Sequence, residues 1–168
     1  MPIHLNDVDL ASRTEGLNSA LIIPCYLCPA VTLAVRNNKP FLQPLRHFFK
    51  SPPFEQYIDD IQFRLGERGV RSAVFKSHFV LHWFLCMWTF GRRKKLKRQL
   101  AKYDAATILG CDSATEAVLD LVDEADCKVI QGMEVDGFMN AEMTFHRPCD
   151  ISFADSRIIP IEQQTQAG

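Results

Sequence analysis

The stretch YDAATILGCDSATEAVLDLVDEADCKVIQGMEVDGFMN, residues 103–140, decides the fold. Residues 105–109 are apolar and uninterrupted, which is typical of a short strand buried on both faces. A helix is predicted next, because apolar residues recur at helical spacing from Ala114 to Ala125. Residues 127–130 are a second apolar segment and are expected to form the next strand. A strand, a crossover helix and another strand of this length predict parallel pairing with a right-handed connection.

The turn between the first strand and the helix of this unit carries Gly110, Cys111, Asp112 and Ser113. The run from Ser113 to Glu116 fits a capping box, in which the serine oxygen and the glutamate carboxylate satisfy N–H groups of the first helical turn. Cys111 would then lie where unpaired N–H groups and the helix dipole favour a thiolate or a bound anion. The structural alternative for Cys111 is a small buried residue at a tight turn.

The segments before this unit continue the alternation of strands and helices. Residues 19–24 form an apolar run that ends at a proline, and we expect them to be the first strand of the sheet. Residues 54–65 have the apolar spacing of an amphipathic helix, and residues 70–76 are expected to be the second strand. Residues 30–39 are ambiguous, because their apolar residues alternate as in a strand.

Three further helices are predicted around these strands. Residues 41–50 form a plausible short helix. Residues 79–90 are apolar on all sides, which indicates a helix buried in protein, and residues 92–103 continue as a helix with a basic outer face.

The sum of these elements predicts a single Rossmann-like α/β domain over residues 18–161. Strands that alternate with helices favour one parallel sheet with helices on both faces. We expect a flavodoxin-like order, in which the second strand lies beside the first, followed by the third and the fourth. Residues 133–161 are expected to start irregularly and to end as a short β-rich extension. We expect residues 1–17 to be a flexible arm or a docked edge segment. Residues 162–168 are expected to be a frayed tail.

Length and composition are those of one ordinary globular domain, with 168 residues that are 47% hydrophobic and 23% charged. The formal net charge of −1 gives no general attraction to nucleic acid or to an anionic membrane. The amino-terminal residues lack the apolar core of a signal peptide, and no apolar run reaches the roughly 20 residues that span a bilayer. We therefore expect a cytoplasmic protein, whose six cysteines are thiols, metal ligands or catalytic groups rather than disulfides.

Thiol and polar side chains follow three of the predicted strands, and ligands of open parallel sheets bind beyond the carboxyl ends of the strands. These residues are Cys25 and Cys28, which form a CxxC motif, then Ser77 and His78, and then Cys111 and Asp112. Three thiols and an imidazole near one rim can bind zinc or an iron–sulfur cluster, because soft thiolates select such metals. The predicted metal ligands are Cys25, Cys28, Cys111 and His78.

Other residues at this rim are candidates for binding a cofactor or for catalysis. The cofactor-binding set is Cys25, Cys28, Cys111, Ser113, Met133 and Glu134, and the catalytic set is Cys111, His78 and Asp112. Cys111 would be a reactive thiol, and His78 would be a proton carrier. Asp112 and Glu134 would be polar supports. Met133 begins a segment rich in methionine and glycine, which is expected to form an adaptable loop beside the rim.

Other interpretations of these residues stay open. The CxxC motif is also typical of a redox dithiol, in which one thiolate attacks and the other resolves, and it can be two partly buried thiols at a turn. His78, His82 and Cys86 would share one face of the apolar helix, where two histidines can hold a metal. A histidine on so apolar a helix is more often packed and hydrogen-bonded to backbone.

The run RRKKLKR at residues 92–98 is the chain's only dense charge run. Its basic residues are Arg92, Arg93, Lys94, Lys95, Lys97 and Arg98. They are candidates for binding a protein partner or an anionic ligand, and the alternative is a solvated helix face. The near-neutral charge of the chain argues against nucleic acid as the partner.

The function predicted from the sequence is a cysteine-centred metal, iron–sulfur or redox protein with its site at the carboxyl ends of the parallel strands. As an enzyme it would be a thiol- or metal-dependent oxidoreductase. The alternative is a non-catalytic Rossmann-like subunit or regulator that binds a partner or an anionic small molecule through the rim and the basic helix. A third interpretation is an enzyme that binds a phosphorylated or nucleotide ligand at the Cys111 turn. The motifs GxxxxGK[ST], GxGxxG, GxSxG and HExxH are absent, which argues against the nucleotide-binding and hydrolase classes they mark.

Overall fold

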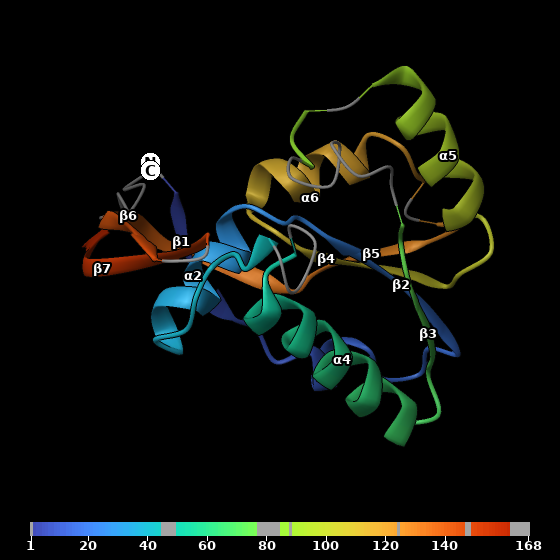
Figure 1. Cartoon of the computed structure of the whole chain (residues 1–168). Coiled ribbons are helices and arrows are strands. Elements are labelled where there is room, and N and C mark those ends of the chain that lie inside the picture. Colours follow the sequence, from blue (N-terminus) through green and yellow to red (C-terminus); the bar gives the residue numbers. More distant parts are fainter. Residues whose placement is uncertain are drawn as a thin grey trace, which may run out of the picture.

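The computed structural model of the chain describes residues 2–44, 50–76, 85–87, 89–123, 125–146 and 149–161. These residues form two sheets, one parallel and one antiparallel, with helices packed around them (Figure 1). Residues 45–49 of the helix predicted over 41–50 lie outside the described residues, as do residues 79–84 and 88 of the helix predicted over 79–90. Residues 41–43 and 85–87 are not helical, so these predictions are wrong there. No helix among the described residues is long and apolar enough to cross a membrane.

The parallel sheet contains the four strands that the sequence predicts. They are β2 (Ser19–Pro24), β3 (Arg71–Val74), β4 (Ala105–Leu109) and β5 (Lys128–Gln131), in the order β3-β2-β4-β5 with every neighbouring pair parallel. All residues of β2 and β4 are buried, as expected for the two central strands of a sheet covered on both faces. The prediction of an α/β chain with a parallel sheet is therefore confirmed.

Helices lie on both faces of this sheet. Helix α4 (Pro52–Glu67) covers one face, and α5 (Phe90–Leu100) and α6 (Asp112–Leu119) cover the other (Figure 1). Right-handed crossovers require this arrangement, because the chain steps from β2 to β3 in one direction and from β3 through β4 to β5 in the other.

The expectation of one sheet with a short β-rich end was wrong. A second, antiparallel sheet has the order β1-β6-β7 and consists of β1 (Ile3–Asp7), β6 (Met133–His146) and β7 (Asp150–Pro160). The segment expected to begin irregularly at Met133 is thus a long strand, because β1 pairs with its first half and β7 with its second. Residues 3–7 form an edge strand rather than a flexible arm, which agrees with the alternative of a docked edge segment, since Leu5 is wholly buried in the core.

The structure decides one ambiguous segment and corrects two details of another helix. The ambiguous segment near residue 30 is a helix, α2 (Cys28–Arg36), because Pro29 suits a first helical turn and its inner face is buried. The capping box at Ser113 does not form, since Cys111 is the N-cap of α6 and makes no side-chain capping bond. Helix α6 also ends at Leu119, earlier than its apolar stripe predicts.

A small polar network joins the two sheets across α2 and α4. The Arg36 guanidinium donates to the Asp7 carboxylate and to the backbone oxygen of Leu5, both at 2.7 Å. The Tyr57 hydroxyl donates to the same carboxylate at 2.9 Å. Strand β1 is thereby attached to the helices that follow β2.

A carboxylate ties together the amino edge of the parallel sheet. Asp104, directly before β4, accepts hydrogen bonds from the backbone N–H groups of Asn18 (3.0 Å) and Ser19 (2.9 Å) at the start of β2. Its own N–H donates to the hydroxyl of Ser19 at 3.1 Å. The hydrogen bond from Asn18, together with those from Ser19, holds the pKa of Asp104 below its usual value.

We expect Asp104→Asn to lower the free energy of unfolding at neutral pH, because a neutral amide accepts these hydrogen bonds more weakly than a carboxylate. The carboxylate contributes above its unfolded pKa of 3.8, and the contribution is lost as pH falls through the lower folded pKa. Urea unfolding at neutral pH and near pH 3 measures this, and the gap between the two proteins should narrow in acid. Asp126→Asn, at an exposed position before β5, is the control and should change little. An equal gap at both pH values would contradict the assignment.

Candidate functional site

The candidate site lies where the two central strands end. Cys25 directly follows β2, and Cys111 follows β4 after one glycine. The strand ends are in register, since Pro24 pairs with Leu109 and the Cys25 N–H donates to the Leu109 carbonyl at 2.9 Å. The connection that follows β2 leads to β3 on one side, and the connection that follows β4 leads to β5 on the other. Open α/β sheets bind ligands at such a switch point, where the connections diverge.

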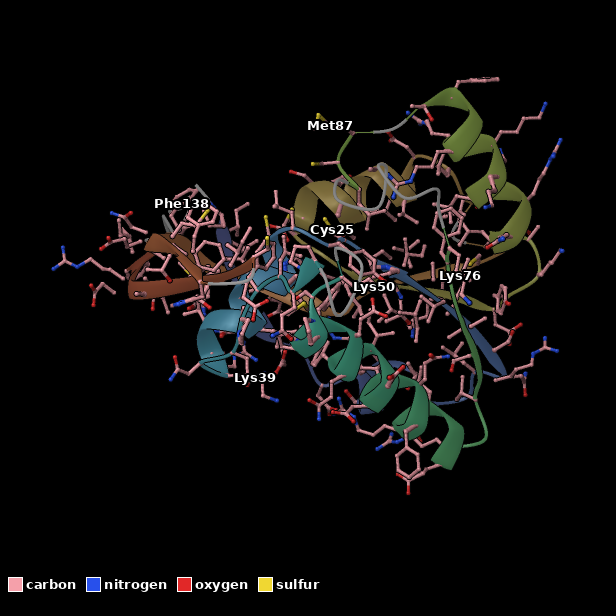
Figure 2. All side chains as sticks on the ribbon, viewed as in Figure 1. Cys25, Lys39, Lys50, Lys76, Met87 and Phe138 are labelled. Carbon is pink, nitrogen blue, oxygen red and sulfur yellow. The ribbon has the colours of Figure 1, made fainter. Side chains whose placement is uncertain are left out.

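Three cysteines gather at this switch point, and we call Cys25, Cys28 and Cys111 the thiol cluster. Cys28 opens α2 on the turn that follows β2, and Cys111 is the N-cap of α6. Cys25 and Cys111 are buried and Cys28 is half-buried. Figure 2 shows Cys25 in the interior of the molecule, at the end of β2. All three cysteines are free thiols.

Burial makes the Cys25 thiol a weak acid. Desolvation raises the pKa of Cys25 to about 11, and the neighbouring thiols of Cys28 and Cys111 add to the increase. Hydrogen bonds from the backbone of Leu85 and Leu27 to its sulfur lower the pKa by less. Cys25 is therefore protonated at neutral pH.

The pKa of Cys28 is raised by the same causes as that of Cys25. Desolvation raises the pKa of Cys28, a hydrogen bond from the backbone of Ile3 lowers it, and the thiols of Cys111 and Cys86 raise it further. The negative forms of Cys111 and Cys86 thus act on Cys28 electrostatically.

A buried cation accompanies the thiol cluster. Arg92, on the first turn of α5, is only 5% exposed and interacts with Cys25. Burial lowers the pKa of its guanidinium, and the negative form of Cys25 raises it. Arg92 therefore does not belong to the solvated basic face that the sequence predicts, because α5 turns its Arg92, Leu96 and Leu100 side toward the core.

The other basic residues of α5 do lie toward solvent. Lys94, Lys95, Lys97 and Arg98 are exposed, and Arg93 is half-buried. Two of these five are engaged: Arg93 pairs with Asp120 at 3.8 Å, and the Lys95 ammonium donates to the Lys76 carbonyl at 2.8 Å.

The remaining predicted site residues are placed differently. Asp112 is exposed beside Cys111, and its carboxylate accepts a hydrogen bond from the Gln131 amide at 2.5 Å. Ser113 is exposed on the first turn of α6. Met133 is wholly buried in the core rather than part of a loop, and Glu134 accepts a hydrogen bond from Arg13 at 2.9 Å. Met133 thus packs in the core, and Glu134 forms an ion pair with Arg13.

The fourth predicted ligand, His78, lies outside the described residues, as does Ser77. Within the part of the chain that the structure describes, no three His, Cys, Asp or Glu side chains stand in an arrangement that could hold a metal ion. A shared ion would therefore require the side chains of the thiol cluster to rotate toward one another.

Sequence reasoning did not join Cys86 to the thiol cluster. The apolar pattern assigned Cys86 to a helix face shared with two histidines, whereas residues 85–87 form a bend. Cys86 raises the pKa of Cys28, and no periodic pattern in the sequence points to that interaction.

A cavity elsewhere in the fold has no such chemistry. It has a volume of about 280 Å³ and lies between α1 (Leu10–Arg13) and the carboxyl-terminal half of α4. Its lining mixes Asp9 and Glu67 with Arg64 and Arg68, and it contains no thiol.

Comparisons of the chain with models of known protein families, with curated proteins and with solved structures gave no match. What the thiol cluster does therefore has to follow from its own residues: three thiols, backbone N–H donors to two of the sulfurs, and a buried guanidinium.

Proposed function

We propose that the thiol cluster binds a thiophilic metal, either a zinc ion or an iron–sulfur cluster, and that this centre is the functional site of the protein. The observation that carries the proposal is that Cys25 and Cys111 follow the paired ends of β2 and β4, with Cys28 at the start of α2 three residues after Cys25. Soft thiolates select zinc and iron–sulfur clusters over the hard cations that oxygen ligands prefer.

The acidity of the thiols supports a metal site over a redox dithiol. An attacking cysteine needs a thiolate at neutral pH, which low-pKa environments provide. A pKa of about 11 leaves Cys25 almost entirely protonated and so a poor nucleophile. A metal ion removes this obstacle, because its positive charge displaces the protons and compensates the desolvated sulfurs.

Backbone hydrogen bonds support the same proposal. The sulfur of Cys25 accepts from the backbone of Leu85 and Leu27, and that of Cys28 accepts from the backbone of Ile3. Donors of this kind orient metal-bound thiolates and tune the potential of iron–sulfur clusters. The buried guanidinium of Arg92 adds a positive charge that interacts electrostatically with Cys25.

We also propose that the parallel sheet is Rossmann-like with a flavodoxin-like order. The support is that β2 and β4 are neighbours at the centre, with β3 and β5 outside them. In such a sheet the switch point is the ligand site, and here it holds Cys25 and Cys111. The proposal also places the protein in a reducing compartment such as the cytoplasm, where thiols remain available to a metal.

The test is the metal and acid-labile sulfide content of protein purified without oxygen. We expect the wild-type chain to hold stoichiometric metal, and Cys25→Ser and Cys111→Ser to lose it. Iron lost together with sulfide identifies a cluster, and zinc alone identifies a mononuclear site. Cys149→Ser is the matched control, because Cys149 is exposed directly before β7 and its substitution should not affect metal content. Circular dichroism of each variant separates loss of metal from loss of fold.

A colourless protein that takes up neither zinc nor iron, with six reactive thiols, would overturn the proposal. The alternative would then be a partner-binding subunit, and two surfaces support it. One is the basic face of α5, with Lys94, Lys97 and Arg98 exposed. The other is the antiparallel sheet, which exposes several large apolar side chains, among them Phe138 (Figure 2) and, at 74% exposure, Phe145.

A further inference from the structure

The outward face of α5 combines basic side chains with one exposed aromatic ring. Helical spacing brings positions 90, 94, 97, 98 and 101 onto one stripe, opposite the buried side formed by Arg92, Leu96 and Leu100. We call this stripe the outer stripe of α5, and all its members are exposed: Phe90, Lys94, Lys97, Arg98 and Ala101. Figure 1 shows α5 at the outer edge of the molecule.

The positive charge of the outer stripe is not neutralised within the described part of the chain. Lys94, Lys97 and Arg98 form no ion pair or hydrogen bond with any described residue. Helix α5 contains no acidic residue, and its first turn carries Arg92 and Arg93, where the helix dipole favours acids. Because helix stability alone would favour an acid in that turn, the concentration of positive charge indicates a role outside the helix.

An exposed apolar end adjoins these cations. Phe90 is the first residue of α5, and at 82% it is the most exposed large hydrophobic side chain among the described residues. Met87, three residues earlier, is 59% exposed. Figure 2 shows Met87 at the top of the view, where α5 also begins. Apolar side chains at the end of a row of cations fit a surface that is anionic outside and apolar beneath.

We propose that the outer stripe of α5 docks on the surface of an anionic phospholipid membrane. Lys94, Lys97 and Arg98 would contact the headgroups, and Phe90 would insert at the boundary between headgroups and acyl chains. Nucleic acid would use the same cations, but it offers no apolar layer for Met87. Docking is peripheral, because α5 has only 11 residues and its inner face is buried in the protein.

This docking does not depend on the thiol cluster. The formal net charge of the whole chain is −1, so attraction to an anionic surface must come from a local patch. Substitutions within the outer stripe should therefore abolish it without altering the parallel sheet.

The experiment is sedimentation of the full chain with vesicles of phosphatidylcholine, either alone or mixed with phosphatidylserine. We expect binding to the mixed vesicles only, and weaker binding at high salt. Replacing Lys94, Lys97 and Arg98 by glutamine should weaken binding about five-fold per cation, or roughly 100-fold together. Phe90→Ser should weaken it by about 10-fold or more, because no ring is then removed from water. These positions are exposed, so the fold should be retained, which circular dichroism verifies.

Two control variants match these substitutions. The first replaces by glutamine three exposed cations on other parts of the chain: Lys39, Lys50 and Arg71. The second is Phe63→Ser, since Phe63 is 67% exposed on α4 but lies one turn from the carboxylates of Asp59 and Glu67. Both controls should leave binding to the mixed vesicles nearly unchanged.

Three results would overturn the inference. The first is a wild-type chain that does not bind phosphatidylserine vesicles. The second is an equal loss of binding in the control variants. The third is binding to single-stranded RNA that the mixed vesicles do not displace, which would identify nucleic acid as the partner of the outer stripe.

Discussion

Phe54→Ala should lower the free energy of unfolding by about 3–5 kcal/mol, the range typical of removing a buried phenylalanine. Phe54 lies on the first turn of α4 and is wholly buried. Its ring makes an edge-to-face contact with Tyr26, with the ring centroids 5.1 Å apart. Tyr26 belongs to the turn between Cys25 and Cys28, so the cavity left by the substitution would lie beneath the CxxC motif. We therefore expect weaker metal binding as well, at temperatures where the variant is still folded.

Phe63→Ala is the matched control, because Phe63 lies on the same helix and is 67% exposed. It removes the same atoms from the surface, where substitutions usually change stability by less than about 0.5 kcal/mol. Denaturant unfolding of both variants beside the wild-type protein gives the comparison. Equal losses of stability in the two variants would contradict the packing of α4 described above.

The parallel half of the fold was predictable because its signals are local. The strand at residues 105–109 is an uninterrupted apolar run, and it is a strand in the structure with the same bounds. The amphipathic spacing of residues 54–65 likewise marks α4. A short stretch of sequence decides each of these elements, since the face it buries is visible in its own pattern.

The antiparallel sheet was not predictable in the same way, because its strands depend on distant partners. Ile3 pairs with Phe138 and Asp7 with Met133, from opposite ends of the chain. Neither segment shows a strong pattern alone: β1 is short, and β6 mixes glycine, methionine and acidic residues. Their hydrogen bonds form only when the chain brings them together, so tertiary context decides them.

Part of the candidate site could likewise be predicted from local sequence patterns, and part could not. The placement of Cys25 and Cys111 at one edge of the sheet followed from the strand topology, because Cys25 directly follows β2 and Cys111 follows β4 after one glycine. The position of Cys86 depends on a bend with no periodic pattern. Arg92 belongs to a charge run that resembles a solvated face, and only the rotation of α5 shows that its first turn points inward.

The Gly110→Ala substitution should destabilise the protein by roughly 1–3 kcal/mol, the usual cost of overpacking, and should impair metal binding. A Cβ at Gly110 would lie 2.8 Å from the Cβ of Ala114 and 3.3 Å from that of Cys25. Neither atom is the end of a flexible side chain, so α6 would have to move away from β2. That movement would separate Cys111 from Cys25, and we expect both lower stability in urea and weaker metal binding.

The origin of this effect can be isolated with a second substitution. If the clash with Ala114 dominates, Ala114→Gly in the Gly110→Ala background should restore metal binding, although glycine within a helix costs about 1 kcal/mol by itself. Gly66→Ala is the matched control, because a Cβ at that position of α4 meets nothing within 4 Å. It should stabilise the protein by up to about 1 kcal/mol through higher helix propensity, opposite in sign to Gly110→Ala. Destabilisation of equal size by both substitutions would mean that close packing at the switch point is not what requires glycine at residue 110.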